Sequence, residues 1–154
     1  MMDTISHAAP AINWRAWFMR LLAMAGIGVS GYLTWTHLAN QAIACGGSQG
    51  CDIVQQSVYS EVMGVPVALL GLLAYAILLA LTWLRGRLPT ELDAYVPLAV
   101  FGISLIGVLY SAYLTYLELY VIDAICRWCV SSAIIMTAIF LLSLLDLRVG
   151  ADLS

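Results

Sequence analysis

The sequence carries little charge. Only 10% of its 154 residues are Asp, Glu, Lys or Arg, whereas 63% are hydrophobic. A soluble globular domain has about 25% charged residues, and a chain of this length still exposes much of its surface after folding. The net charge of −3 also excludes the basic surface that nucleic acids and other polyanions require. These absences exclude a soluble domain and indicate that lipid surrounds most of the chain.

Four long apolar segments contain no charged residue at all. They are Leu21–Ala39, Val62–Leu84, Ala94–Leu117 and Trp128–Leu145. Each has about the 20 residues that a helix needs to cross a bilayer. One such segment could be a buried helix of a soluble protein, but four of them in a short chain favour membrane spans. The sequence therefore predicts an all-α integral membrane protein, a four-transmembrane-helix bundle. Residues 1–154 would form this single domain, with spans near 18–40, 64–84, 95–117 and 127–146.

The basic residues predict an orientation in the membrane. Arg15, Arg20, the 85–87 turn and Arg148 fall on one side of the predicted spans, and Arg127 falls on the other. Because basic residues concentrate in cytoplasmic loops, we expect both termini and the 85–87 turn in the cytoplasm. All four cysteines then lie on the extracytoplasmic side, where disulfides persist.

The first extracytoplasmic loop combines a glycine-rich stretch with an amphipathic one. Cys45 and Cys51 enclose five residues, three of them glycine, so the stretch between them is flexible. Residues 52–59 then predict a short amphipathic helix on the membrane surface, because their apolar residues share one helical face. Residues 42–44 resemble a signal-peptide cleavage site. The apolar run before them is longer than a signal core, so we expect an uncleaved first span.

Two further cysteines open the last apolar run, in Cys126-Arg127-Trp128-Cys129. This spacing at the start of a helix favours redox chemistry, because the helix N-terminus stabilises a thiolate and the two sulfurs can bond. The flexible pair, Cys45 and Cys51, could exchange with this fixed pair through mixed disulfides. The flexible pair would collect electrons from a partner, and the fixed pair would pass them on. Arg127 would lower the pKa of a neighbouring thiol, and Trp128 would anchor the helix at the interface.

The cysteines also allow two other interpretations. All four could bind zinc, although the spacing of Cys45 and Cys51 is loose for a zinc knuckle. They could instead form two structural disulfides in a non-catalytic membrane scaffold. A Cys-x-x-Cys loop is too short to stabilise a fold much, however. We therefore expect no metal site and favour thiol–disulfide exchange.

Electrons that reach Cys129 need an acceptor. The chain has neither the Rossmann nor the P-loop glycine pattern, so no bound nucleotide is implied. A membrane quinone could diffuse laterally into a helical bundle, which can hold a ligand among its helices. Tyr110, Tyr113 and Tyr120 share a helical face and could line a ring pocket or form an interfacial aromatic belt. Ser57 could donate a hydrogen bond to a quinone oxygen or be an ordinary exposed serine.

The order of these motifs resembles that of the bacterial vitamin K epoxide reductase homologues. The shared features are a loop Cys-x5-Cys-Asp, a serine six residues past its second cysteine, Gly64-Val65-Pro66 before the second span, and a Cys-x-x-Cys opening the fourth. They cover the chain from about Trp17 to Leu145. In that family a four-helix bundle surrounds a quinone near the outer membrane surface. The loop cysteines carry electrons from a thioredoxin-fold partner.

The resemblance implies a role for each matching residue. Cys51 would form the mixed disulfide with the partner, Cys45 would attack Cys126, and Cys129 would face the quinone. Ser57 matches the loop serine of the family. The implied activity is that of a quinone-dependent thiol oxidoreductase that generates disulfides, with ubiquinone or menaquinone as acceptor.

The resemblance also implies a setting, the inner (plasma) membrane of a bacterium. Many bacterial members carry a fused thioredoxin-like domain, for which this chain is too short. We therefore expect an extracytoplasmic thioredoxin-fold thiol oxidase as a partner in trans. The four-helix disulfide generator of the Dsb system has its cysteine pairs in the opposite order. Vertebrate members have a tyrosine where this chain has Ala133, which argues against vitamin K epoxide as substrate. The alternative is a quinone or epoxide reductase that uses the same cysteines.

Overall fold

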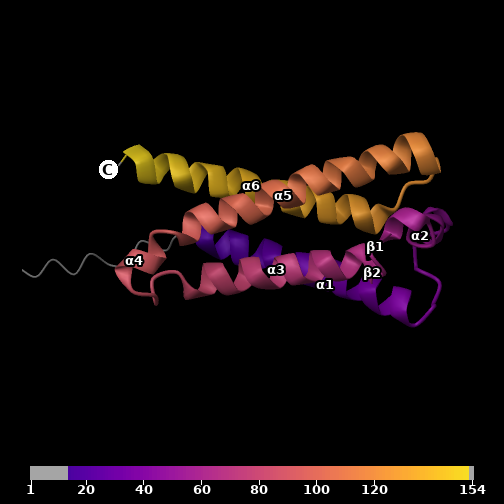
Figure 1. The fold of residues 1–154 in the computed structure, drawn as a ribbon, viewed down its shortest axis with the longest axis horizontal. Helices are drawn as coiled ribbons and strands as arrows, with labels where there is room; N and C mark the ends of the chain where they lie inside the picture. Colours follow the sequence, from indigo (N-terminus) through magenta and orange to yellow (C-terminus); the bar gives the residue numbers. More distant parts are fainter. Residues whose placement is uncertain (1–13, 153–154) are drawn as a thin grey trace, which may run out of the picture.

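The computed structural model describes residues 14–152, which fold as a bundle of four long helices (Figure 1). These are α1 (Trp14–Leu38), α3 (Val67–Leu84), α5 (Val96–Leu117) and α6 (Arg127–Asp152). All four are long and apolar enough to cross a membrane. Helix α1 begins before the predicted span 18–40 but ends at Leu38, and α6 continues past the predicted end at 146. The two chain ends, residues 1–13 and 153–154, which we expect in the cytoplasm, lie outside the described residues.

Short elements connect the long helices at both ends of the bundle. They are α2 (Gly50–Gln55), η1 (Val58–Ser60), β1 (Glu61–Val62), β2 (Val65–Pro66), α4 (Thr90–Asp93) and η2 (Glu118–Ile122). Figure 1 shows α2 and the two strands at one end and α4 at the opposite end. The end that carries α2 is called the cysteine end below, because both cysteine pairs lie there.

A β-hairpin replaces the first turn that we predicted for the second span. Strands β1 and β2 pair antiparallel, with Val62 opposite Val65. The turn between them has φ of 53° at Met63 and 80° at Gly64. Tight hairpin turns require such positive values. The predicted start at residue 64 is therefore wrong: the chain pairs as a hairpin up to Pro66, and α3 begins at Val67.

A short helix, α2, lies where we predicted a surface helix over residues 52–59, but its bounds and its exposed residues differ from the prediction. It begins at Gly50 and ends at Gln55, and Ser57 is extended before the short helix η1. Val54 is buried, whereas Ile53 and Val58 are exposed. The apolar residues therefore do not share one face, because the backbone changes direction at Ser57.

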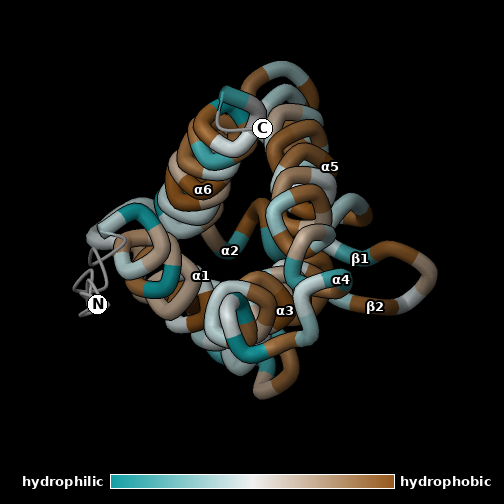
Figure 2. The backbone as a smooth tube through the Cα atoms, turned by 90° about the vertical axis from the view of Figure 1, so that its left-hand side faces the viewer, coloured by the Kyte–Doolittle hydropathy of each residue, from teal (hydrophilic) through white to brown (hydrophobic). Residues whose placement is uncertain are grey.

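Viewed along the bundle, the long helices form a ring in the order α1, α3, α5, α6 (Figure 2). Glycines allow close contact within two of the pairs. A Cβ at Gly26 of α1 would collide with the ring of Tyr75 on α3, and one at Gly107 of α5 would lie 2.8 Å from the sulfur of Met136 on α6. Hydrophobic residues also cover the outer faces, as expected for helices in lipid.

An ion cluster holds the end opposite the cysteines. The carboxylate of Asp146 on α6 accepts hydrogen bonds from Arg85 at 2.6 Å and from Arg15 at 3.4 Å. The guanidinium of Arg20 donates to the carbonyl oxygen of Thr82 at 2.8 Å. These contacts tie α1, α3 and α6 together at the edge of the apolar layer.

Candidate functional site

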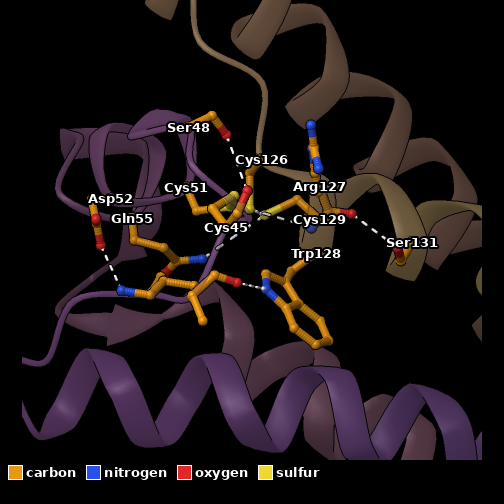
Figure 3. The surroundings of a disulfide bond; sticks show 12 residues. Cys45, Ser48, Cys51, Asp52, Gln55, Cys126, Arg127, Trp128, Cys129 and Ser131 are labelled. Atoms are coloured by element: carbon orange, nitrogen blue, oxygen red, sulfur yellow. Dashed lines mark hydrogen bonds between the residues drawn. A yellow bond between two sulfur atoms is a disulfide. The ribbon is translucent and has the colours of Figure 1, made fainter.

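The two cysteine pairs lie side by side at the cysteine end (Figure 3). Cys45 and Cys51 form a disulfide with their Cα atoms 6.1 Å apart. Cys126 and Cys129 are free thiols. Cys45, Cys51 and Cys126 belong to one buried hydrophobic cluster, and Cys129 packs against it. The structure thus brings together the four cysteines that the sequence singles out.

Hydrogen bonds from three elements hold the segment before Cys45. The amide of Ala44 donates to the hydroxyl of Tyr32 on α1 at 3.1 Å, and the indole of Trp128 on α6 donates to the carbonyl of Ala44 at 3.0 Å. Asp52 on α2 accepts from the amide of Ile43 at 2.9 Å. The rings of Tyr32 and Trp128 pack 4.9 Å apart. Trp128 therefore fixes the loop against the fixed cysteine pair.

The glycines of the loop permit close packing as well as flexibility. A Cβ at Gly50 would collide with the carbonyl oxygen of Ile125, the residue before Cys126. Gly46 has a φ of 65° and lies against the guanidinium of Arg127. Helix α2 can therefore dock directly on the backbone that leads into the fixed pair.

The fixed pair is arranged to favour a thiolate on Cys126. The Cys129 thiol donates a hydrogen bond to the Cys126 sulfur at 2.7 Å, and the Cys129 amide donates to it at 3.3 Å. The thiol hydrogen bond is the main cause that lowers the pKa of Cys126, and burial opposes it. We predicted that Arg127 would lower this pKa. Its guanidinium instead lies against Gly46. The two sulfurs are close enough to form a disulfide after little movement.

The sequence does not predict one residue of the site, Glu118. It lies at the start of η2, a π-helical turn that continues α5, and is only 4% exposed. One carboxylate oxygen accepts a hydrogen bond from the amide of Cys126 at 3.1 Å. Glu118 directly follows the third predicted span, eight residues before Cys126, and an acidic residue at that place gives no clear signal.

A cavity of about 390 Å³ opens beside Cys129. Its wall is mostly apolar and comes from all four long helices, with α2 and η1 at the cysteine end. Polar side chains, those of Gln55, Ser57 and Glu118, line the same cavity. The Gln55 amide lies 3.9 Å from the Cys129 sulfur, and the Ser57 hydroxyl donates to the carbonyl of Val54 at 2.6 Å.

The three candidate tyrosines do not share this cavity. Tyr110 lines it. Tyr113 is 50% exposed, and Tyr120 is also exposed; neither is part of the wall formed by the described residues. The rings of Tyr110 and Tyr113 lie 6.1 Å apart. The predicted ring pocket of three tyrosines is therefore not formed, since the rotation of α5 leaves Tyr113 exposed and Tyr120 lies exposed on η2.

The sequence matches the model of the vitamin K epoxide reductase family over residues 17–144. The chain belongs to this family. The matched range contains both cysteine pairs, Glu118 and every residue of the cavity wall. As a member of the vitamin K epoxide reductase family, the protein is a multi-pass membrane protein built on a four-helix bundle.

One curated relative of known activity is similar over most of this chain. It is the thiol-disulfide oxidoreductase LTO1 of Arabidopsis thaliana, 30% identical over 122 residues. The match covers 76% of this chain but 32% of the relative, so the chain spans about a third of that protein's length.

The site has no arrangement suited to a bound metal ion. Among residues 14–152, no group of three or more His, Cys, Asp or Glu side chains lies close enough together to hold one. Two of the four sulfurs are joined as a disulfide, which leaves them unable to act as thiolate ligands.

Proposed function

We propose that the protein is a quinone-dependent thiol oxidoreductase that generates disulfides. The observation that carries this proposal is the position of Cys129. Its sulfur lines the cavity, while its partner Cys126 packs in the same cluster as the Cys45–Cys51 disulfide. One thiol of the fixed pair thus faces a site for a small acceptor, and the other faces the loop.

Electrons would enter through the loop disulfide. A thiolate of a thioredoxin-fold partner attacks Cys51 and releases Cys45, and the second thiol of the partner completes its own disulfide. Cys45 then attacks Cys126 of an oxidised fixed pair and releases Cys129. Attack of Cys51 on Cys45 restores the loop disulfide and leaves the fixed pair reduced. The structure, with the loop disulfide closed and the fixed pair free, corresponds to this reduced state.

The first step requires the loop to open. Cys51 is fully buried, so a partner cannot reach its sulfur in the conformation described here. The glycines at 46 and 47 have positive φ values and carry no side chain that would hinder a change of backbone conformation. We infer that the loop moves away from α6 when the partner, supplied in trans, binds.

The cavity fits a quinone as the acceptor. It is mostly apolar, with Ser57, Gln55 and Tyr110 available near Cys129 to contact a polar ring. Leu70 of α3 and Ile106 of α5 belong to the wall and are also exposed on the outer face of the bundle. Lateral access from lipid between α3 and α5 suits ubiquinone or menaquinone. The quinone supplies an acceptor for two electrons and two protons.

We further propose that the cysteine end faces the extracytoplasmic side of a bacterial inner membrane. Arg15, Arg20 and Arg85 lie at the opposite end, with Arg15 and Arg85 paired to Asp146. Basic residues concentrate on the cytoplasmic side. The cysteines would then work where disulfides persist.

The test is a comparison of three forms in membranes that contain quinone. The wild type, Cys129→Ala and Ser131→Ala would be supplied with a reduced thioredoxin-fold oxidase, and its disulfide formation followed. We expect oxidation with the wild type and with Ser131→Ala, an exposed neighbour on α6, and none with Cys129→Ala. Unchanged oxidation by Cys129→Ala would contradict the proposal and favour a scaffold with structural disulfides.

A parallel assay separates this function from an epoxide reductase. Quinone and vitamin K epoxide would be offered separately with one reduced dithiol donor. We expect turnover with quinone alone, because Ala133, which lines the cavity, stands where vertebrate members have a tyrosine. Turnover with the epoxide at a similar rate would favour the reductase instead.

A further inference from the structure

Glu118 is a buried acidic group in the wall of the cavity that thiol exchange does not use. Its side chain lines the cavity together with Cys129. Among the described residues that form this wall, it is the one with a carboxyl group, and no His, Lys or Arg accompanies it. A carboxyl group buried at the edge of an apolar layer is costly, so a stabilising or chemical role is expected.

Glu118 lies beside the fixed pair. It accepts a hydrogen bond from the amide of Cys126 at 3.1 Å, and it lines the same cavity as Cys129. The π-helical turn η2 carries it there, and the backbone carbonyl of Glu118 accepts from the amide of Ala124 at 3.1 Å. The carboxyl group thus lies next to the fixed pair and on the wall of the space proposed for the quinone.

Oxidation of the fixed pair by a quinone requires proton transfer. Oxidation of two thiols by a quinone breaks two S–H bonds, forms one S–S bond, and transfers two electrons and two protons to the quinone. The cavity wall is mostly apolar, so a proton from Cys129 needs a nearby acceptor. A carboxylate on the same cavity wall is such an acceptor.

We propose that Glu118 is the proton-transfer residue of the quinone site, an inference that rests on the proposed function. It takes the proton of the Cys129 thiol as that sulfur reacts and gives it to the nearer quinone oxygen. The proton of Cys126 leaves to solvent, and the second quinone oxygen takes one proton from solvent. The S–S bond forms as the two S–H bonds are lost, and the two electrons released pass to the quinone together with the two protons accounted for above, so atoms and electrons balance.

Replacement of Glu118 by Gln separates this role from a structural one. Gln keeps an oxygen that can accept the hydrogen bond from the Cys126 amide, but it cannot take up a proton. We expect quinone-dependent turnover of Glu118→Gln to fall about 100-fold, the size typical of a lost acid–base group. Glu118→Asp keeps a carboxyl group and should recover part of that loss. Asp123→Asn, an exposed neighbour outside the cavity, is the matched control.

A second measurement, made without quinone, follows alkylation of Cys126 and Cys129 by iodoacetamide against pH, with the modified peptides assigned by mass spectrometry. Loss of the negative charge of Glu118 should move the alkylation midpoint of the pair down by roughly one pH unit. The other titratable groups on the cavity wall are Tyr59, Tyr75 and Tyr110, and all three are unchanged in the variant.

Two results would overturn the inference. One is turnover of Glu118→Gln within twofold of the wild type. The other is a loss of turnover with an unchanged alkylation profile, which would mean that the carboxyl group only positions the cysteines. A wild type without any quinone-dependent turnover would instead contradict the proposed function. The alkylation shift would then still show whether the charge of Glu118 acts on the two thiols.

Discussion

The indole nitrogen of Trp128 donates a hydrogen bond to the carbonyl oxygen of Ala44 at a distance of 3.0 Å. This bond joins a residue between the two cysteines of the fixed pair to the residue before Cys45. It holds the loop disulfide against α6. Because the partner must reach the buried sulfur of Cys51, this bond restrains a movement that the proposed reaction requires.

Trp128→Phe should therefore loosen the loop. Phe keeps a ring against Tyr32 but cannot donate to Ala44, and a typical hydrogen bond contributes about 1 kcal/mol. We expect a small phosphine to reduce the Cys45–Cys51 disulfide roughly fivefold faster in this variant. Trp83→Phe, an exposed tryptophan on α3 far from the loop, is the control. Equal reduction rates in all three proteins would show that the bond does not restrain the loop.

Single cysteine variants should identify the sulfur that meets the partner. Cys45→Ala leaves Cys51 without its disulfide partner, so a mixed disulfide with the thioredoxin-fold oxidase cannot be resolved from within the loop. We expect mass spectrometry to find that mixed disulfide on Cys51. Cys51→Ala should give no comparable product, and a stable adduct on Cys45 in that variant would reverse the assigned roles.

The pH dependence of Cys126 reactivity should change when Cys129 is removed. The thiol of Cys129 donates to the Cys126 sulfur and lowers the pKa of Cys126, so the thiolate persists to lower pH than usual and is lost as pH falls through that lowered pKa. In Cys129→Ala this donor is gone, and the pKa should rise. Alkylation of Cys126 should then slow at neutral pH and approach the wild-type rate in alkali. An unchanged profile would assign the lowered pKa to another cause.

Tyr110 and Tyr113 offer a matched pair for the quinone site. Tyr110 lines the cavity, whereas Tyr113 is exposed on the same helix. An aromatic contact contributes about 1 kcal/mol, so Tyr110→Ala should raise the KM for quinone about fivefold. Tyr113→Ala should leave the KM unchanged in the same steady-state assay. Equal effects of the two substitutions would indicate that the ring of Tyr110 does not meet the quinone.

Gly50→Ala should weaken the docking of α2. The new methyl group would collide with the carbonyl oxygen of Ile125, and forced contacts of this kind cost about 1–3 kcal/mol. We expect a lower thermal unfolding temperature for the protein in detergent. Gly28→Ala adds the same methyl group to α1, where no atom lies within 4 Å, and should not lower that temperature. A stable Gly50→Ala protein would mean that the loop docks differently.

The main features of the fold can be predicted from the distribution of charge. Four apolar segments free of charged residues match the long helices, because a bilayer demands both the length and the composition. The Cys126–Cys129 spacing predicts a reactive pair at the start of α6, because the helix N-terminus stabilises a thiolate and the two sulfurs can bond. The hairpin at 61–66 could not be predicted, since strands of two residues are too short to show an alternating pattern.

The cavity was harder to predict from sequence than the cysteines. Helix α5 is apolar on all sides, so its sequence does not indicate which face turns inward. Tyr110 and Tyr113 therefore look equivalent until the packing of α5 against α6 fixes the rotation of the helix. Glu118 falls where the third predicted span meets a loop, a position where an acidic residue is ordinary. Only the π-helical turn η2 brings its carboxylate within hydrogen-bond distance of the Cys126 amide.

Both cysteine pairs lie at one end of the bundle, and the ion cluster around Asp146 lies at the other. In the proposed reaction, electrons enter through Cys51 and leave through Cys129 at the same membrane face. The thiol protons are released and taken up on that face too, so no charge crosses the bilayer. The reaction would then neither build nor consume a membrane potential. It would be driven by the difference in reduction potential between the thiols and the quinone alone.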